Sequence, residues 1–400
     1  AGNIPERHVA DQAPVVPDIV TIGCRQKRMV IDRESRRTVA QRGIKVRRFS
    51  HSRSNGKQRR ILRFTHEHNP WNARRWYVTE ISPAINFSVG YFPRDSHADW
   101  YRAASGVCEN LAVAEQLTET ERTALINAVH KSYMEIFPTA TIESKLDVLE
   151  PGSYVAVTCS PTKGVDETLD MSERLADRGF KVVPHIAARM VRDRAHLREI
   201  IGRINKTPII SLFVPGGDAD KPVGDYHKAL DLLRDIADIE HKFTEIGIGA
   251  HPEGHPIASD EELVEQLLAK QEYANYLVTQ MCFDAKRIDS WLREIRERGV
   301  HIAAWLGMPG AADRSSLIRT SLRIGVGDSV RYLKRQGKNA AQLMASKEYL
   351  PDDLQLELAS TIADPELKVE GQHVFCFNLV DRTETWRHDF IASLENSEKN

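Results

Sequence analysis

Eight short apolar runs constrain the fold of this chain most strongly, because stretches of amphipathic helical character separate most of them. The runs are rich in branched and aromatic residues, which is typical of buried strands, and the stretches between them, such as "DYHKALDLLRDIADI", have the spacing of helices with one apolar face. The runs lie at residues 133–138, 154–159, 181–186, 208–214, 245–250, 275–280, 300–305 and 373–378. Because strand–helix–strand repeats form right-handed parallel crossovers and eight strands can close a sheet, the pattern predicts an α/β fold, a (βα)₈ TIM barrel.

The length of 400 residues suggests two domains or one large barrel with an appendage. We predict a barrel domain at residues 131–395 and a basic N-terminal extension at residues 1–130 that is partly packed on the barrel. The long insertion between the seventh and eighth runs, about residues 306–372, is predicted to be mostly helical.

The net charge of −1 hides an uneven distribution. Residues 24–75 contain 17 Lys and Arg against three acids, which gives this segment +14 and leaves −15 for the rest of the chain. Such a block can neutralise a phosphate backbone or an acidic protein surface, it can belong to an organellar protein, or it can cover the acidic domain of its own chain. We therefore expect either a nucleic-acid or acidic protein partner for residues 24–75, or packing of this segment on the barrel.

Composition also bears on the compartment of the protein. No run reaches the roughly 18 apolar residues that a membrane span needs, and residues 1–20 lack the apolar centre of a secretory signal. The five cysteines are odd in number, far apart and never in CxxC spacing, which argues against a disulfide framework and a thiolate zinc site. We expect a cytoplasmic protein, with the mitochondrial matrix as the alternative, that forms a homo-oligomer and has no membrane partner.

Glu135 stands out because it lies among aromatic and branched residues in the run "YMEIFP". A glutamate in a core strand loses hydration worth roughly several kcal/mol unless it is paired, hydrogen-bonded or protonated. A strand-end glutamate that faces water is the alternative interpretation. Polar residues also close or follow other runs: Thr158, His185, Asp218, His251, Glu253, His255 and Gln280. Because the chemistry of TIM barrels gathers at the C-terminal strand ends, we predict a functional site there.

Several segments of the barrel region carry a resemblance to a known family. They read, in order, "YMEIFPT", "YVAVTCSPTKGVDET", "VVPHIAAR", "GGD", "HPEGHP", "YLVTQMCFD", "LGMPG" and "HVFCFNLVDRTET". In order and approximate spacing, this series resembles methylenetetrahydrofolate reductase over about residues 131–390. The resemblance implies a barrel that passes a hydride from NAD(P)H, usually through FAD, to the methylene group of methylenetetrahydrofolate, producing methyltetrahydrofolate.

The resemblance also implies roles for individual residues. Glu135 matches the general acid that helps open the imidazolidine ring to a reactive iminium, and the apolar strand around it would raise its pKa. Asp218 matches an aspartate near the pterin that favours the cationic iminium, and Gln280 matches a glutamine that hydrogen-bonds the pterin. The positions that correspond to cofactor contacts in the family are Thr158, His185, Tyr226, His255 and Lys270. Tyr226 corresponds only with a shift of the alignment, and Lys270 only if a one-residue gap is allowed.

Departures from the family pattern fall at positions that lie near the flavin in the family. "FVPGGD" lacks the arginine expected before its glycines and aspartate, and "CSPTKG" replaces a glycine-containing loop. These departures favour the divergent reductases that move the hydride directly from the nicotinamide, so the chain is expected to act with or without a bound flavin.

A different class of function is a barrel recruited as a structural subunit of a larger assembly through its basic arm. His251, Glu253 and His255 could converge on a metal ion, but the loop "HPEGHP" lacks helical spacing and we expect no metal.

Overall fold

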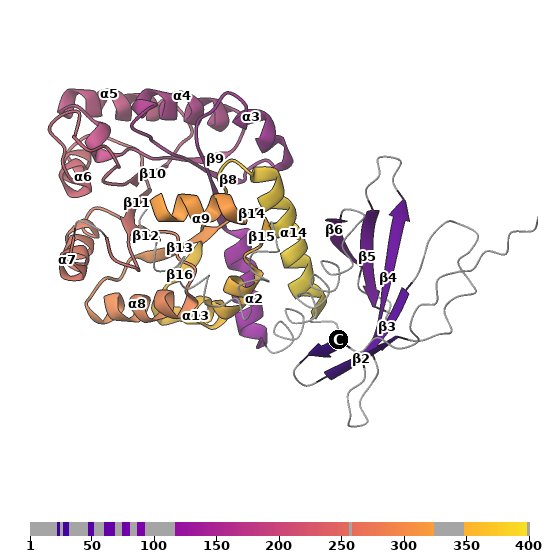
Figure 1. The fold of residues 1–400 in the computed structure, drawn as a ribbon. Coiled ribbons are helices and arrows are strands. Elements are labelled where there is room, and N and C mark those ends of the chain that lie inside the picture. The colour runs from indigo at the N-terminus through magenta and orange to yellow at the C-terminus, as the bar shows by residue number, and fades with distance from the viewer. Residues whose placement is uncertain are drawn as a thin grey trace, which may run out of the picture. The chain divides into compact units, whose positions relative to one another are not determined.

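The computed structural model describes residues 117–255, 258–323 and 348–397, together with the backbone of six strands between residues 22 and 92 (Figure 1). The chain divides into two compact units, residues 1–106 and residues 107–398. Each unit is described by itself below.

The six strands of the first unit form one antiparallel sheet in chain order. They are β1 (Ile22–Cys24), β2 (Lys27–Ile31), β3 (Arg47–His51), β4 (Arg60–His68), β5 (Arg74–Glu80) and β6 (Asn86–Phe92). This sheet was not among the elements predicted from the sequence. The basic side chains of residues 24–75 lie outside the described residues, so the partner expected for them stays a prediction.

The eight strands of the second unit are all parallel and surround a common interior (Figure 1). They are β7 (Ser132–Ile136), β8 (Tyr154–Val157), β9 (Lys181–Pro184), β10 (Ser211–Val214), β11 (Glu245–Ala250), β12 (Tyr276–Thr279), β13 (Ala303–Pro309) and β16 (Val369–Phe375). The two end strands, β9 and β10, are joined through a bridge between His185 and Phe213, and Ile186 N–H donates to Phe213 O at 2.9 Å. The predicted TIM barrel is confirmed, and each predicted run overlaps one of its strands, although β7, β13 and β16 extend beyond their runs.

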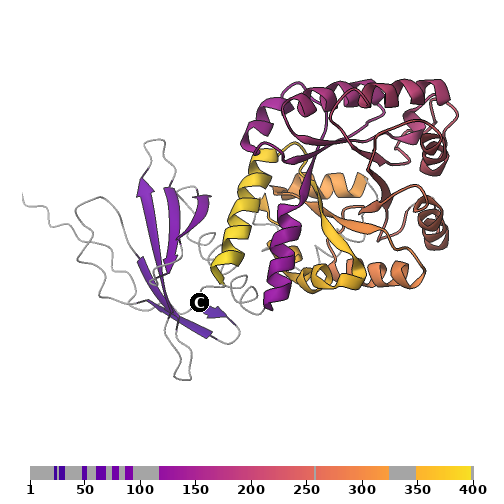
Figure 2. The same ribbon diagram turned by 180° about the vertical axis from the view of Figure 1, so that it is seen from behind.

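Helices surround the barrel between these strands (Figure 2). They are α3 (Ile142–Lys145), α4 (Gly164–Asp177), α5 (Arg194–Ile204), α6 (Ala229–Ala237), α7 (Asp260–Lys270), α8 (Ala285–Glu297) and α14 (Val380–Ser397), with the short 3₁₀ turns Leu146–Val148, Ala188–Met190 and Pro365–Leu367. Among the described residues, no helix combines the length and the apolar character that a bilayer span requires.

Helix α2 (Glu119–His130) precedes the first barrel strand and belongs to the barrel unit. It begins with a capping box, because the Thr118 hydroxyl accepts from Glu121 N–H while the Glu121 carboxylate accepts from Thr118 N–H. Arg122 donates to the carbonyl of Leu394 in α14 at 3.3 Å. The helix falls within residues 1–130, the predicted extension, because a sequence pattern alone does not show on what a helix packs.

The described part of the insertion after β13 contains α9 (Arg314–Arg323), α12 (Asp352–Glu357) and α13 (Ala359–Ala363). A two-stranded antiparallel sheet, β14 (Ala312–Asp313) with β15 (Glu348–Tyr349), ties its two ends together. Residues 324–347 lie outside the described residues. The described part therefore agrees with the helical pattern, apart from these two short strands.

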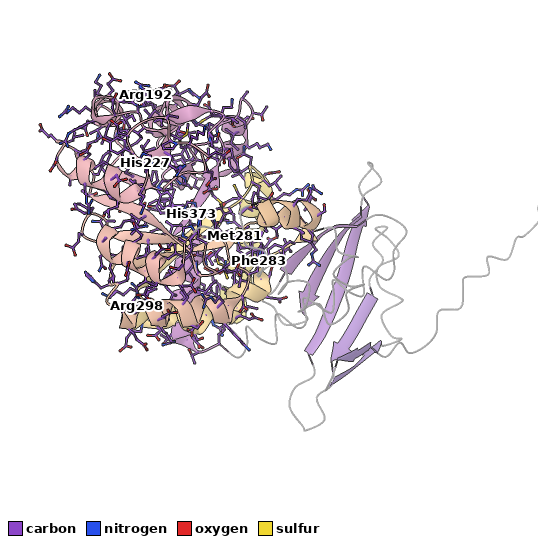
Figure 3. All side chains as sticks on the ribbon, turned by 60° about the vertical axis from the view of Figure 1, so that its left-hand side comes forward. Arg192, His227, Met281, Phe283, Arg298 and His373 are labelled. Carbon is purple, nitrogen blue, oxygen red and sulfur yellow. The ribbon has the colours of Figure 1, made fainter. Side chains whose placement is uncertain are left out.

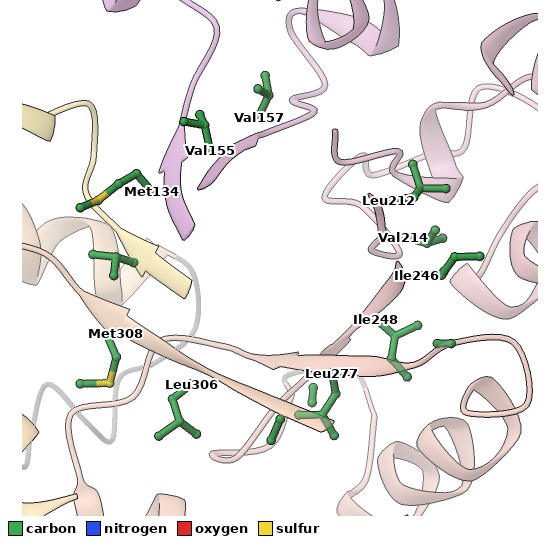
Figure 4. Close-up of a cluster of buried hydrophobic side chains, with 14 of the residues drawn as sticks. Met134, Val155, Val157, Leu212, Val214, Ile246, Ile248, Leu277, Leu306 and Met308 are labelled. Atoms are coloured by element: carbon green, nitrogen blue, oxygen red, sulfur yellow. The ribbon is translucent and has the colours of Figure 1, made fainter. Parts of the chain in front are cut away.

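Alternation along the strands divides the core into two layers. Met134 and Ile136 of β7 join a large cluster under the helices, and Figure 4 shows Met134 and its equivalents on neighbouring strands on the outer face of the barrel. Tyr133 points the other way, into an inner cluster that includes Trp305, whose ring centroid is 4.4 Å from that of Tyr133. Glu135, two residues after Tyr133, therefore faces the barrel interior.

Gly307 of β13 allows a close approach of neighbouring backbone. A Cβ atom at this position would lie 2.0 Å from Thr279 O, and the Gly307 N–H donates to the Thr279 hydroxyl at 2.7 Å. We expect Gly307→Ala to lower the free energy of unfolding by about 1–3 kcal/mol or more, because fixed backbone must shift. The matched control is Gly249→Ala, whose Cβ would lie 3.9 Å from the Phe213 ring. Urea unfolding of both variants checks this, and equal midpoints would contradict it.

Candidate active site inside the barrel

A buried polar cluster lies inside the barrel and is made by three strands. Glu135 comes from β7, His373 from β16 and His185 from the residue after β9; their exposed fractions are 8%, 3% and 5%. One potential ligand atom from each side chain lies within 4.8 Å of those from the other two. Figure 3 places His373 within the barrel, whereas Arg192 and Arg298 lie toward its outer side. The cluster is therefore held by the frame of the fold and not by a loose loop.

Glu135 and His373 form a direct pair. The carboxylate Oε2 lies 2.9 Å from His373 Nε2. At this distance the oxygen and the nitrogen form a hydrogen bond, so one of the two atoms carries a proton, either the carboxyl oxygen or the ring nitrogen. The pair therefore holds a proton in the interior of the barrel. This pairing accounts for the burial of Glu135, because the carboxylate is bonded to a histidine instead of facing only apolar residues or water.

His185 is the third member and is held differently. Its ring lies 4.6 Å from the Phe213 ring and 5.6 Å from the His373 ring, measured between centroids. Burial, and to a lesser degree the nearby His373, lower the pKa of His185 well below its ordinary value, so its imidazole is neutral. Among the described residues, its Nε2 has no hydrogen-bond partner. A buried polar atom left without a partner costs about 1–3 kcal/mol, which suggests that the site is built for a bound group.

Thr158 carries a second buried polar atom without a partner in the described part of the chain, its hydroxyl Oγ1. The residue follows β8, and its N–H donates to Ile136 O at 3.0 Å, which places its backbone beside the end of β7. Its carbonyl accepts from the Thr168 hydroxyl at 2.9 Å. The Thr158 backbone is thus fixed while its side chain remains available to a ligand.

The segment after β16 fastens the end of β7. The Asn378 side chain accepts from Phe137 N–H at 2.9 Å and donates to Phe137 O at 3.1 Å. Phe377 and Asn378 have φ values of 52° and 60°, a left-handed conformation that is uncommon for residues other than glycine. Cys376 donates its thiol to Glu135 O at 2.9 Å, and burial raises the pKa of this thiol to about 12, so it keeps its proton. These contacts hold the backbone that carries Glu135.

Two other predicted residues lie at the mouth of the barrel. Gln280 directly follows β12 and is in phase with the inward-facing Tyr276 and Val278. Its side-chain oxygen accepts from Met281 N–H at 2.9 Å, which orients the amide. Asp218 is exposed in the loop after β10. Among the contacts of the described residues, none joins either side chain to the buried cluster.

The remaining predicted cofactor residues are engaged elsewhere or exposed. The Tyr226 hydroxyl donates to Asp235 at 2.6 Å, and Lys270 Nζ donates to Gly249 O at 3.2 Å. His255 is exposed, and its ring centroid lies 5.0 Å from that of His251. Within the described ranges, the structure brings together Glu135 and His185 but adds none of these three to them.

A redox cofactor implied by such a site can be tested against these donors. The unpartnered Thr158 hydroxyl and His185 nitrogen fit a polar planar group bound inside the mouth. Tyr226 and Lys270, the other two predicted cofactor contacts named above, each make an internal hydrogen bond, to Asp235 and to Gly249 O. The described residues thus have polar groups for a redox group near the buried cluster, and the flavin contacts expected from the sequence stay a prediction.

His373 is the functional residue that sequence reasoning missed. The run at residues 373–378 was recognised, but β16 begins at Val369, so His373 lies in the middle of the strand and not at its start. The available signal was the same as for Glu135, namely a polar residue in an apolar strand, two residues from an aromatic one. Two such residues in neighbouring strands are candidates to pair, because a hydrogen bond between them offsets the cost of burying both polar side chains.

The fold and the site define a TIM-barrel protein with a buried acid–base pair at the catalytic end of its strands. Residues 140–309 match the family model of methylenetetrahydrofolate reductase. The match supports a methylenetetrahydrofolate reductase family member and, at the family level, a folate-related oxidoreductase of a kind that usually has a redox cofactor. The matched range includes Thr158, His185 and Gln280, while Glu135 and His373 lie on either side of it.

Two solved structures are similar to this chain at a coarse level. Oxaloacetate acetylhydrolase in complex with the inhibitor 3,3-difluorooxalacetate is 8% identical, with 63% of this chain and 77% of that chain covered and a TM-score of 0.39. A putative lyase/mutase from Burkholderia cenocepacia J2315 is 14% identical, with 66% and 85% covered and a TM-score of 0.38. Likeness at this level carries no information about function.

Lys270 gives a pH-dependent prediction. Burial lowers the pKa of its amine from 10.5 to about 8 in the folded chain. The unfolded chain therefore binds this proton more tightly, and the free energy of unfolding should rise as the pH increases from about 8 to 10. Lys270→Met should be more stable than the wild type at pH 7, and the difference should shrink toward pH 10. Urea unfolding at several pH values checks this, and a pH-independent difference between the two proteins would contradict it.

Proposed function

We propose that this chain interconverts 5,10-methylenetetrahydrofolate and 5-methyltetrahydrofolate by hydride transfer with NAD(P)H. The observation that carries the proposal is the 2.9 Å hydrogen bond between Glu135 and His373 inside the barrel, together with the match of residues 140–309 to the methylenetetrahydrofolate reductase family model. The coenzyme, when bound, supplies or accepts the hydride. The residues of the chain supply the proton, the orientation and the exclusion of water.

The chemistry requires such a proton because the methylene carbon bridges two nitrogens. When the ring opens, the departing nitrogen takes a proton and the carbon becomes part of an iminium cation. A hydride added to that carbon then completes the methyl group, so one proton and one hydride are consumed. Glu135 is proposed to deliver the proton, with His373 as the positioning residue that holds the carboxyl group and shares its proton.

The mouth of the barrel supports the binding of the folate. Gln280 offers an amide that is in phase with the barrel interior and oriented by Met281 N–H, which suits the donor and acceptor edge of a pterin. Asp218 is exposed above the same end of the strands, where a carboxylate would favour the cationic iminium electrostatically. Phe137, 38% exposed beyond Glu135, adds an aromatic face at this end.

Glu135→Gln tests the proton donor. The variant keeps the size of the side chain but removes the transferable proton, so we expect a loss of turnover of about 10²- to 10⁴-fold with folate binding retained. The matched control is Glu370→Gln on the neighbouring strand β16, whose carboxylate is paired at the surface with Lys131 at 2.9 Å, and it should behave like the wild type. Turnover is followed through NAD(P)H absorbance. Activity of Glu135→Gln within about threefold of the wild type would remove Glu135 from the mechanism.

Gln280→Ala tests the pterin contact. The loss of buried hydrogen bonds should weaken folate binding by about 1–3 kcal/mol, because donors and acceptors of the pterin are left unpaired. The control is Gln271→Ala at the C-terminal end of helix α7. It removes an amide that donates to Gly299 O and accepts from His301 N–H, and it should leave folate binding unchanged. Calorimetric titration gives both dissociation constants. An unchanged value for Gln280→Ala would exclude this residue from the folate site.

A further inference from the structure

We propose that Glu135, His185 and His373 bind one divalent transition-metal ion, of the zinc type, in an open site inside the barrel. The three side chains form a group in which one ligand atom of each lies within 4.8 Å of the others, and all three are buried. The inference concerns the same side chains as the proposed function but does not depend on it, because metal binding needs neither folate nor coenzyme.

The geometry is close to that of a coordinated ion. Zinc is bound by imidazole nitrogen and carboxylate oxygen at about 2.0–2.2 Å, which places tetrahedral ligands about 3.4 Å from one another. Glu135 and His373 are already closer than this, at 2.9 Å, and the widest separation in the group exceeds it by at most about 1.4 Å. A rotation of one imidazole ring covers such a difference.

The kinds of ligand select the class of metal. Two imidazoles and one carboxylate suit zinc and neighbouring first-row metals, whereas calcium and magnesium prefer oxygen ligands alone. Three protein ligands leave at least one coordination position open, which is the arrangement of catalytic sites and not of closed structural ones. The strand positions matter as well, because β7, β9 and β16 are parts of one hydrogen-bonded sheet and hold the ligands in advance of binding.

The unpartnered nitrogen of His185 is the independent observation that points to a ligand. Its Nε2 is buried and has no hydrogen-bond partner among the described residues, although His373 and Glu135 lie beside it. Phe213 and Phe375 line the same space, since both rings contact a histidine of the group. An ion there would satisfy His185 and would be screened little by water.

Metal binding and the proposed proton transfer exclude each other. The ion takes the place of the proton between Glu135 and His373, so this proton moves to solvent or to the other ring nitrogen of His373, and the carboxylate becomes a ligand. A loaded site would therefore lack the acid that the folate reaction uses. The same three side chains can serve either a proton or a metal, and zinc is expected to inhibit any turnover that depends on Glu135.

The direct test is metal binding to the full chain. The protein is first treated with a chelator that is then removed, and it is titrated with Zn²⁺ by calorimetry and with Co²⁺ by visible absorption. We expect one ion per chain in this site, and His185→Ala should weaken its binding at least about 100-fold, more than the 10- to 100-fold typical of a lost outer partner. The matched control is His251→Ala, since the His251 ring packs edge to face with that of His255, outside the group. It should bind as the wild type does.

Two results would overturn the proposal. One is the absence of any Zn²⁺ or Co²⁺ binding by the wild type at micromolar concentrations. The other is binding that His185→Ala leaves unchanged, which would place the metal on other histidines. Circular dichroism shows whether the variant is folded, and His185→Gln replaces it if it is not. Turnover measured with chelator present tests the folate proposal separately, so either proposal can fail while the other stands.

Discussion

The hydrogen bond between Glu135 and His373 is the interaction on which the site depends. The two residues are 238 positions apart in the chain but lie on adjacent strands, where Tyr133 is the direct partner of His373 and Phe375 that of Glu135. Alternation turns both polar side chains to the same interior. Removal of one partner of a buried hydrogen bond costs about 1–3 kcal/mol, because the other group is left unsatisfied. The pair therefore couples the closure of the barrel to its chemistry.

The surroundings of the pair are rigid for identifiable reasons. Below it, the rings of Tyr133, Trp305 and Tyr276 fill the barrel, and Gly247 leaves room for the Tyr276 ring, since a Cβ there would lie 2.3 Å from it. Beyond the end of β7, the Asn378 side chain binds both backbone groups of Phe137. The left-handed conformation of Asn378 stores strain that the surrounding contacts must offset, as is common at functional sites.

Several residues named from the sequence illustrate what pattern alone cannot decide. Tyr226 and Lys270 were assigned to a cofactor by position in the family, yet their polar atoms bind Asp235 and Gly249 O within the fold. A residue type at a given spacing indicates which chemistry is possible. It does not state whether the side chain faces the site or a neighbouring helix, because that depends on contacts made after the elements pack.

The barrel was predictable from local pattern, because the alternation of apolar runs with amphipathic helices can be recognised without knowing which elements pack together. The sequence by itself also determined that Glu135 needed explanation, since a carboxylate among Tyr133, Met134 and Ile136 is costly in any core. Only the tertiary structure decided the answer. His373 and His185 come from strands far from Glu135 in the chain, and the parallel register that brings their side chains together arises from closure of the sheet, which no local pattern encodes.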